Sequence, residues 1–107
     1  MRHFLEVDDL TVEELQHVLE LSIKPDLPKV LDGQGVALIF EKPSGRTRNS
    51  MEMATVQLGG HPMYIKPEEL GIDTRETAED VVRTMAGYHS VLAARVFDHD
   101  RLERMAA

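Results

Sequence analysis

The stretch GVALIFEKPSGRTRNSMEMA, residues 35 to 54, decides how this chain folds. Its first six residues form a continuous apolar run with β-branched members, which is typical of a strand buried on both faces. Polar residues follow Phe40, and a helix is predicted from about Thr47 to Leu58, where Gly59 and Gly60 end it. A buried strand followed by a loop and a helix indicates the first half of a βαβ unit.

The segments that follow continue this alternation. HPMYI at 61–65 and VLAARVF at 91–97 are predicted strands, and 66–75 is a predicted polar loop. A helix opening at Glu76 or Thr77 lies before the last strand, and another begins near Asp98 or Asp100. Strands alternating with helices predict the α/β class, as three α-β-α layers with a parallel sheet of βαβ units.

Another helix precedes the first strand. Thr11 and Glu14 fit a capping box, apolar residues then follow at helical spacing, and Pro25 and Pro28 end the pattern. We expect this leading helix to pack across the sheet. The 107 residues suffice for one small domain. The short last helix indicates that residues 1–107 form a single, incomplete domain of a longer design.

Composition and charge exclude several classes of function. The formal net charge is −7, which argues against nucleic acid or an anionic membrane as a bulk partner. The chain has no cysteine, so a zinc-thiolate site or thiolate nucleophile is excluded, and a reducing cytoplasm fits. The first ten residues lack the apolar core of a signal peptide, and no run approaches a membrane span. The histidines show no metal-ligand spacing, so no metal site is predicted.

Positive charge nevertheless gathers directly after the predicted buried strand. Ligands of open parallel sheets bind beyond the carboxyl ends of the strands, and the first amides of a helix favour an anion. Two arginines at a helix start are repelled by its dipole unless an anion lies between them. Converging hydroxyl, amide and guanidinium donors favour phosphate over carboxylate. The residues of this predicted anion site are Ser44, Gly45, Arg46, Thr47 and Arg48. The alternative is that both arginines are solvated surface charges.

Arg95 interrupts the apolar run of the predicted strand at 91–97. A buried charge without a partner is costly. Either Arg95 pairs with an acid such as Glu41, Asp80 or Asp98, or it reaches the 44–48 loop and closes the anion site. Residue spacing leaves both interpretations open.

Two stretches resemble the transcarbamylase family. FEKPSGRTRNSMEMA at 40–54, with QLGGHP shortly after it, resembles the carbamoyl-phosphate loop of these enzymes, whose usual pattern is Ser-Thr-Arg-Thr-Arg a few residues after Phe-Glu. TRETAEDVVRTMAGYHSVLAARVFDH at 74–99 is similar to the family in its Arg-Glu-Ser/Thr, Asp-x-x-Arg and Ala-Arg-Val elements. Phe-Glu-Lys before the loop resembles the ornithine carbamoyltransferases within the family.

The resemblance implies roles for these residues. Ser44, Arg46, Thr47 and Arg48 would bind the phosphate of carbamoyl phosphate, and Arg46 would also lie near the carbonyl that is attacked. Arg95 would contact the same substrate, so Arg46 and Arg95 are the catalytic candidates. Gly45 stands where threonine is usual, so its amide remains for the phosphate while the threonine hydroxyl is lost.

The implied reaction of the parent protein is that of an ornithine carbamoyltransferase in arginine biosynthesis. The δ-amino group of ornithine attacks the carbamoyl carbon, phosphate leaves and citrulline forms, with no metal or organic cofactor. Family members are homotrimers in which a loop, here near Lys66 to Asp73, reaches a neighbouring site.

Family members also continue into a His-Pro-x-Gln motif and a second domain that binds the amino-acid co-substrate. Both are absent from these residues, so we expect the chain alone to be inactive. The alternatives are a non-catalytic anion-binding or oligomerisation fragment, or a transcarbamylase for another amine such as aspartate or putrescine.

Overall fold

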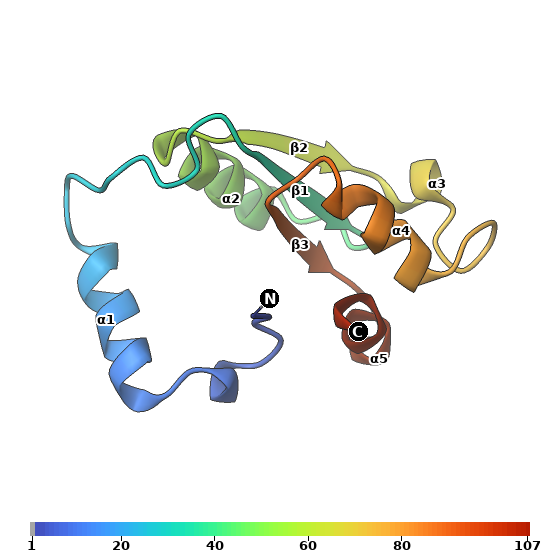
Figure 1. The fold of residues 1–107 in the computed structure, drawn as a ribbon, viewed down its shortest axis with the longest axis horizontal. Helices are drawn as coiled ribbons and strands as arrows, with labels where there is room; N and C mark the ends of the chain where they lie inside the picture. The colour runs from blue at the N-terminus through green and yellow to red at the C-terminus, as the bar shows by residue number, and fades with distance from the viewer. Residues whose placement is uncertain (1) are drawn as a thin grey trace.

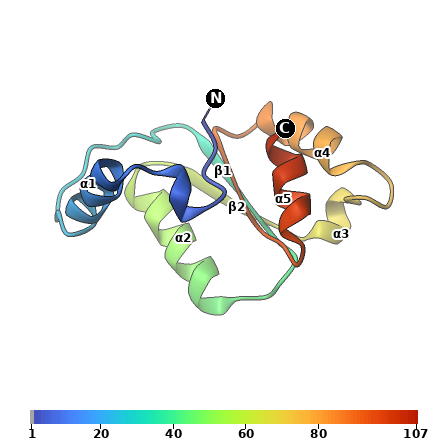
Figure 2. The same ribbon diagram turned by 90° about the horizontal axis from the view of Figure 1, so that it is seen from below.

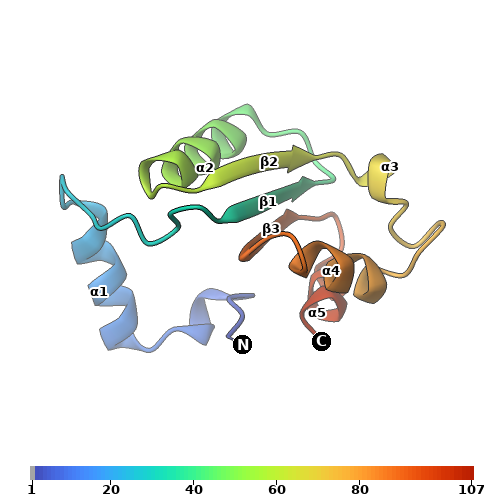
Figure 3. The ribbon, with the colours of Figure 1, turned by 45° about the horizontal axis from the view of Figure 1, so that its top comes forward.

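The structure, a computed structural model, describes residues 2–107 and is built on a three-stranded parallel sheet (Figure 1). Strand β1 (Gly35–Phe40) lies between β2 (His61–Ile65) and β3 (Val91–Arg95). All three arrowheads point the same way (Figure 3). The central place of β1 explains its continuous apolar sequence, because both of its faces and both of its edges are covered.

Helices cover both faces of the sheet (Figure 2). Helix α2 (Gly45–Gln57) lies on one face, where Leu38 and Phe40 pack with Met51. Helices α4 (Ala78–Ala86) and α5 (His99–Ala106) lie on the other, where Ile39 packs with Val81 and Met105. Alternate residues of β1 therefore enter two separate cores, as the two-residue period of a strand requires. The predicted α-β-α layers are confirmed.

The strand order β2-β1-β3 places a topological switch point between β1 and β3. The chain leaves β1 towards β2 and then returns past β1 to β3. Two crossovers of the same hand that run in opposite directions place their helices on opposite faces. Beyond the carboxyl ends of the strands, such a point is the usual ligand crevice of an open sheet. Phe40 and Arg95 end the two strands and are register partners, so the loop after Phe40 begins beside Arg95.

The ends of two elements differ from the prediction. Helix α2 begins at Gly45 rather than at about Thr47, because Ser44 is already its extended N-cap residue, with φ −154° and ψ 100°. Strand β3 ends at Arg95 rather than at Phe97. The amide of Phe97 donates to the side chain of Glu41 instead of continuing the strand.

The predicted loop at 66–75 contains a short helix, α3 (Pro67–Leu70). Pro67 occupies its first turn, where a missing N–H costs nothing. Gly71 ends it with φ 63°, a left-handed backbone that glycine adopts without steric cost.

The leading helix forms as predicted but lies elsewhere. Helix α1 (Val12–Ser22) follows a short 3-10 turn, η1 (Val7–Asp9), and its capping box is present, with Glu14 N donating to Thr11 Oγ1 at 3.1 Å. The expectation that α1 packs across the sheet was wrong: α1 stands apart from it (Figure 1), and none of its residues is buried. Helices α2, α4 and α5 already cover the two faces. None of the helices formed by residues 2–107 is both long enough and apolar enough to span a membrane.

Candidate anion-binding site

Three backbone amides at the start of α2 lack an acceptor. The first intrahelical bond joins Arg48 N to Ser44 O at 2.9 Å. The amides of Gly45, Arg46 and Thr47 therefore have no acceptor within residues 2–107. The first turn also carries no acidic residue. The positive end of the helix dipole is thus uncompensated, which favours a bound anion.

Two hydroxyl groups and a guanidinium group meet beside these amides. Ser44 Oγ donates to Thr47 Oγ1 at 2.9 Å, and Arg95 Nη1 donates to the same oxygen at 3.3 Å. The Thr47 oxygen accepts both bonds, so its own proton remains available to an anion. Of the two interpretations of Arg95, the structure supports the second, since its side chain reaches Thr47 in the 44–48 loop. Arg95 makes no ion pair with any residue from 2 to 107, and it lies exposed at the strand end.

The two arginines of α2 have different surroundings. Arg46 is exposed and has no ion pair or side-chain hydrogen bond in the described part of the chain. Arg48 Nε pairs with Glu52 Oε1 at 3.0 Å, and the Arg48 guanidinium lies 3.8 Å from the centre of the Tyr64 ring. Arg48 would have to leave these partners to bind phosphate, so its phosphate-binding role stays a prediction.

Gly45 is the first residue of α2 and has space around it. A Cβ atom at this position meets no atom within 4 Å, and the backbone is not left-handed. The position therefore accepts the threonine that the resemblance leads one to expect.

We expect Gly45→Ala to raise the free energy of unfolding by about 0.4–1 kcal/mol, because alanine has less backbone freedom than glycine in the unfolded chain. Gly45→Thr keeps the amide and adds a hydroxyl donor, so it is expected to bind inorganic phosphate at least as tightly as the wild type. Urea unfolding and titration calorimetry measure the two effects. Weaker phosphate binding by both variants would show that the anion needs the space that glycine leaves open.

A network of carboxylates and guanidinium groups lies across the α4 and α5 face. The Glu41 carboxylate pairs with Arg101, and Arg101 Nε also contacts Asp73 Oδ2 at 3.0 Å. Arg104 Nη2 contacts Asp73 at 2.7 Å and Glu79 at 3.0 Å. The network joins the loop after β1, the loop before α4, and α5. No pattern in the sequence indicated this network.

The pKa of Asp73 reflects its place in the network. The hydrogen bond from Arg104 is the main reason that the pKa of the Asp73 carboxyl falls to about 2, and the amide of Ala78 and the charge of Arg101 act in the same direction. Asp73 in turn raises the pKa of the Arg104 guanidinium. The negative charge of Asp73 is thus held by the folded state.

This lowered pKa predicts a pH-dependent effect of Asp73→Asn. A carboxyl with a pKa of about 2 when folded and about 3.9 when unfolded stabilises the fold above pH 4. That stabilisation is lost as the pH falls towards 2. We therefore expect Asp73→Asn to lower the free energy of unfolding at pH 7. The difference in this free energy between variant and wild type should disappear as the pH falls from about 5 to about 2. Urea unfolding across this range measures it.

Asp80→Asn is the matched control, since within residues 2–107 the Asp80 carboxylate contacts only Arg83, in an exposed pair at 3.3 Å. Such a pair stabilises little, so this variant should follow the wild type throughout. A constant gap between Asp73→Asn and wild type at every pH would contradict the role given to the Asp73 charge.

One other cluster contains metal-ligating groups. His99 Nε2 lies 3.5 Å from Glu6 Oε1 and 3.7 Å from Glu103 Oε1. The three side chains could hold a metal ion, but all are exposed, and exposed acidic groups of this kind are common without one. The cluster lies outside the anion site.

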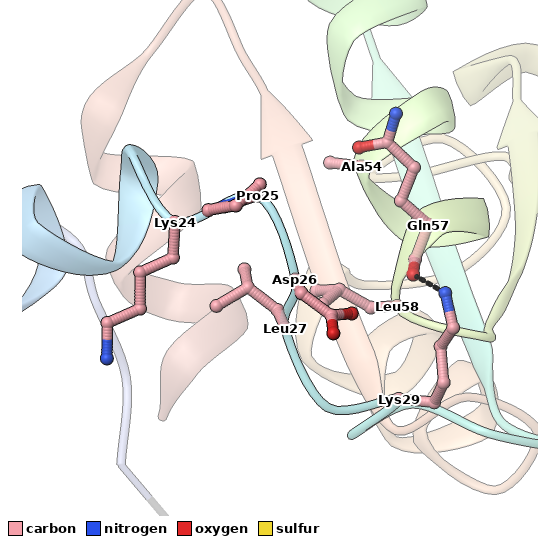
Figure 4. Close-up of a pocket in the computed structure, with 8 residues that line it drawn as sticks. All are labelled: Lys24, Pro25, Asp26, Leu27, Lys29, Ala54, Gln57 and Leu58. Carbon is pink, nitrogen blue, oxygen red and sulfur yellow. Dashed lines mark hydrogen bonds between the residues drawn. The ribbon is translucent and has the colours of Figure 1, made fainter.

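A hollow in the surface lies at the other end of α2. It has a volume of about 410 Å³ (Figure 4) and is lined by Lys24, Pro25, Asp26, Leu27, Lys29, Ala54, Gln57 and Leu58. Lys29 Nζ donates to the backbone oxygen of Gln57 at 2.7 Å, which satisfies a carbonyl at the helix end. A helix of this length places the hollow about 20 Å from Gly45. The donors therefore converge on an open helix tip and not on this hollow.

Comparisons with known proteins identify the family that this chain resembles. The family described as "Aspartate/ornithine carbamoyltransferase, carbamoyl-P binding domain" matches residues 2–107. An ornithine carbamoyltransferase from Haloquadratum walsbyi is 40% identical over 108 residues, which are 98% of this chain and 36% of that protein. The chain thus spans about a third of the length of the curated relatives it matches.

Solved structures give the same likeness. The crystal structure of ornithine carbamoyltransferase from Thermus thermophilus has a TM-score of 0.84 and 37% identity, and the match covers 96% of this chain and 37% of that one. A mutant N-acetyl-L-ornithine transcarbamylase, complexed with carbamyl phosphate and N-succinyl-L-norvaline, has a TM-score of 0.86 and 30% identity, covering 99% of this chain and 40% of that one.

Proposed function

This chain belongs to the aspartate/ornithine carbamoyltransferase family as its carbamoyl-phosphate-binding domain, and we propose that it supplies the carbamoyl-phosphate site of an ornithine carbamoyltransferase. The observation that carries the proposal is the hydrogen bond from Arg95 to Thr47. It brings a guanidinium group from the end of β3 to the amides at the start of α2.

Each group at this helix tip suits one part of a phosphorylated substrate. The amides of residues 45–47 and the hydroxyl of Thr47 would donate to phosphate oxygens, and Ser44 would donate as well by turning its proton from Thr47 to the phosphate. Arg46 and Arg95 would add charge-assisted bonds from two directions. Arg46, which has no competing partner in the described chain, is free to reach the carbamoyl oxygen.

These groups would also stabilise the reaction. When the amine attacks the carbamoyl carbon, negative charge grows on the carbamoyl oxygen and on the departing phosphate. Amide donors held in place by the fold stabilise that charge without reorganising, and the guanidinium groups of Arg46 and Arg95 add charge-assisted bonds. The domain therefore contributes positioning and electrostatic stabilisation, and the residues named here need no redox chemistry for this step.

We propose ornithine as the amine, because relatives at about 40% identity are ornithine carbamoyltransferases. The relative that takes N-acetyl-L-ornithine has nearly the same fold in this region, so this domain does not select the amine by its backbone. Aspartate and putrescine remain the alternatives. A homotrimeric assembly and a cytoplasmic location stay predictions.

A second candidate is a non-catalytic anion-binding or oligomerisation role for the 107-residue chain. This role is favoured by the short length of the matched region, since the chain matches only about 36% of the length of its relatives. In those relatives the remaining length is available for an amino-acid site.

Two measurements on the chain test the proposal. Titration calorimetry with inorganic phosphate and with carbamoyl phosphate should show saturable binding that weakens as salt is added. A citrulline assay with carbamoyl phosphate and ornithine should show no product from the chain alone. Absence of any phosphate binding would refute the site. Citrulline formation by the pure chain would refute the view that the amine site lies elsewhere.

A further inference from the structure

We propose that Glu41 is a positioning residue that holds the phosphate loop, residues 41–47, against the end of β3. The inference rests on the proposed function and deepens it. The site needs two parts of the chain to face one point: the start of α2 and Arg95. Their relative position depends on what fastens the phosphate loop to the segment 95–97.

Three contacts join Glu41 and its neighbour to that segment. The backbone N of Glu41 donates to Arg95 O at 2.8 Å. The Glu41 carboxylate accepts from Phe97 N at 3.1 Å through Oε1, and its Oε2 pairs with Arg101 of α5. Lys42 lies 5.6 Å from the centre of the Phe97 ring. The Glu41 side chain is only 10% exposed, so its carboxylate is largely covered, although Phe97 lies at the surface.

The direction of the Glu41 side chain explains how it acts without occupying the site. Phe40 packs on the α2 side of the sheet, and its register partner Arg95 reaches Thr47 of α2. One residue later, Glu41 contacts Arg101 on the α5 side. Glu41 therefore holds the phosphate loop from the α5 side of the sheet, opposite the anion site.

The charge of Glu41 is balanced as well. A carboxylate next to an anion site repels the anion, and Arg101 neutralises this one by direct pairing. Arg101 is itself held by Asp73 at 3.0 Å. The pair therefore supplies a half-buried anchor that carries no net charge of its own.

A plain stabilising ion pair is the competing interpretation, and Glu79 offers a matched control. Glu79 is a carboxylate of the same network and pairs with Arg104 at 3.0 Å. Within residues 2–107 its side chain makes no hydrogen bond to the phosphate loop or to Phe97. Glu41→Ala and Glu79→Ala remove the same charge and the same side-chain type. Only Glu41→Ala should disturb the anion site.

The experiment compares Glu41→Ala, Glu41→Gln and Glu79→Ala by two readouts. Titration calorimetry with inorganic phosphate gives the dissociation constant, and hydrogen exchange followed by NMR, without any anion, gives the protection of the Phe97 and Arg48 amides. Glu41→Ala should weaken phosphate binding at least about tenfold and speed exchange at both amides, because a hydrogen bond to a charged group is lost. Glu41→Gln keeps an acceptor for Phe97 N and should stay within about threefold of wild type. Glu79→Ala should match wild type.

Each result decides the matter. Equal affinity and equal exchange in Glu41→Ala and Glu79→Ala would overturn the positioning role. If the wild type does not bind phosphate, the proposed function fails, and amide exchange alone then tests the positioning role of Glu41. Faster exchange in Glu41→Ala but not in Glu79→Ala supports that role, and equal exchange in the two variants overturns it. If Glu41→Ala does not fold, Glu41→Asp takes its place, because the shorter carboxylate keeps its charge but falls short of Phe97 N.

Discussion

Replacing Arg46 with alanine is expected to lower kcat by roughly 10²–10³ in a carbamoyltransferase that contains this domain, as the loss of one donor to a developing charge does elsewhere. In the 107-residue chain the same change is expected to weaken phosphate binding at least about tenfold. Arg46 is exposed and unpaired within residues 2–107, so the fold makes no use of its charge. The free energy of unfolding should therefore stay within about 0.5 kcal/mol of wild type.

Arg83→Ala is the control for Arg46→Ala. Arg83 is also an exposed helical arginine, but it lies on α4, and among residues 2–107 its side chain pairs only with Asp80, at 3.3 Å. Its removal changes the net charge equally and should alter neither kcat nor phosphate affinity. Near-normal turnover of Arg46→Ala would remove Arg46 from its proposed role. An equal loss in both variants would point to the overall charge instead.

The sheet and its helices could be predicted from the sequence because their signals are local. The apolar run at β1 and the glycine pair after α2 each specify their own element, whatever the rest of the chain does. Parallel order then follows from the alternation of strands and helices. The same logic predicts an anion site in the loop after β1, because a buried strand that precedes a helix has its ligand edge at the junction.

The supporting network could not be predicted, because it depends on long-range pairing. Glu41, Asp73 and Arg101 come from three separate segments, and no periodicity links them. Asp73 also adopts φ 56°, a left-handed backbone conformation that aspartate tolerates. The neighbouring residues in the sequence do not predict this conformation. Charge pairs between distant loops can therefore be identified only from the three-dimensional structure.

Two further differences have a related cause. The amphipathic pattern of α1 predicted the helix correctly, but where a helix packs depends on which faces remain free. The Ser-x-Arg-Thr-Arg pattern placed Arg48 next to the site, but its side-chain direction is decided by Glu52 and Tyr64. A motif gives the position of a residue, and the neighbouring side chains that bind it decide where its own side chain points.

Leu38→Ala is expected to lower the free energy of unfolding by about 2–5 kcal/mol, because it leaves a cavity at the centre of the sheet. Leu38 is 0% exposed, and its register partners are Tyr64 of β2 and Ala93 of β3. A loss of this size is a large share of the stability of a small domain. Ile39→Val removes one methylene at the next buried position and should cost about 0.5–1.5 kcal/mol, so it provides a graded variant that folds. Urea unfolding measures both.

Val18→Ala on α1 is the control for Leu38→Ala, since Val18 is 48% exposed and should cost far less than a core residue. Phosphate separates the core variant from the site variant. A ligand that binds only the folded state raises its stability by an amount set by the dissociation constant. Saturating phosphate should therefore stabilise wild type and Leu38→Ala equally and Arg46→Ala much less. Equal stabilisation of Arg46→Ala would place the anion elsewhere, and a loss of the effect in Leu38→Ala would mean that the helix tip depends on the packing of β1.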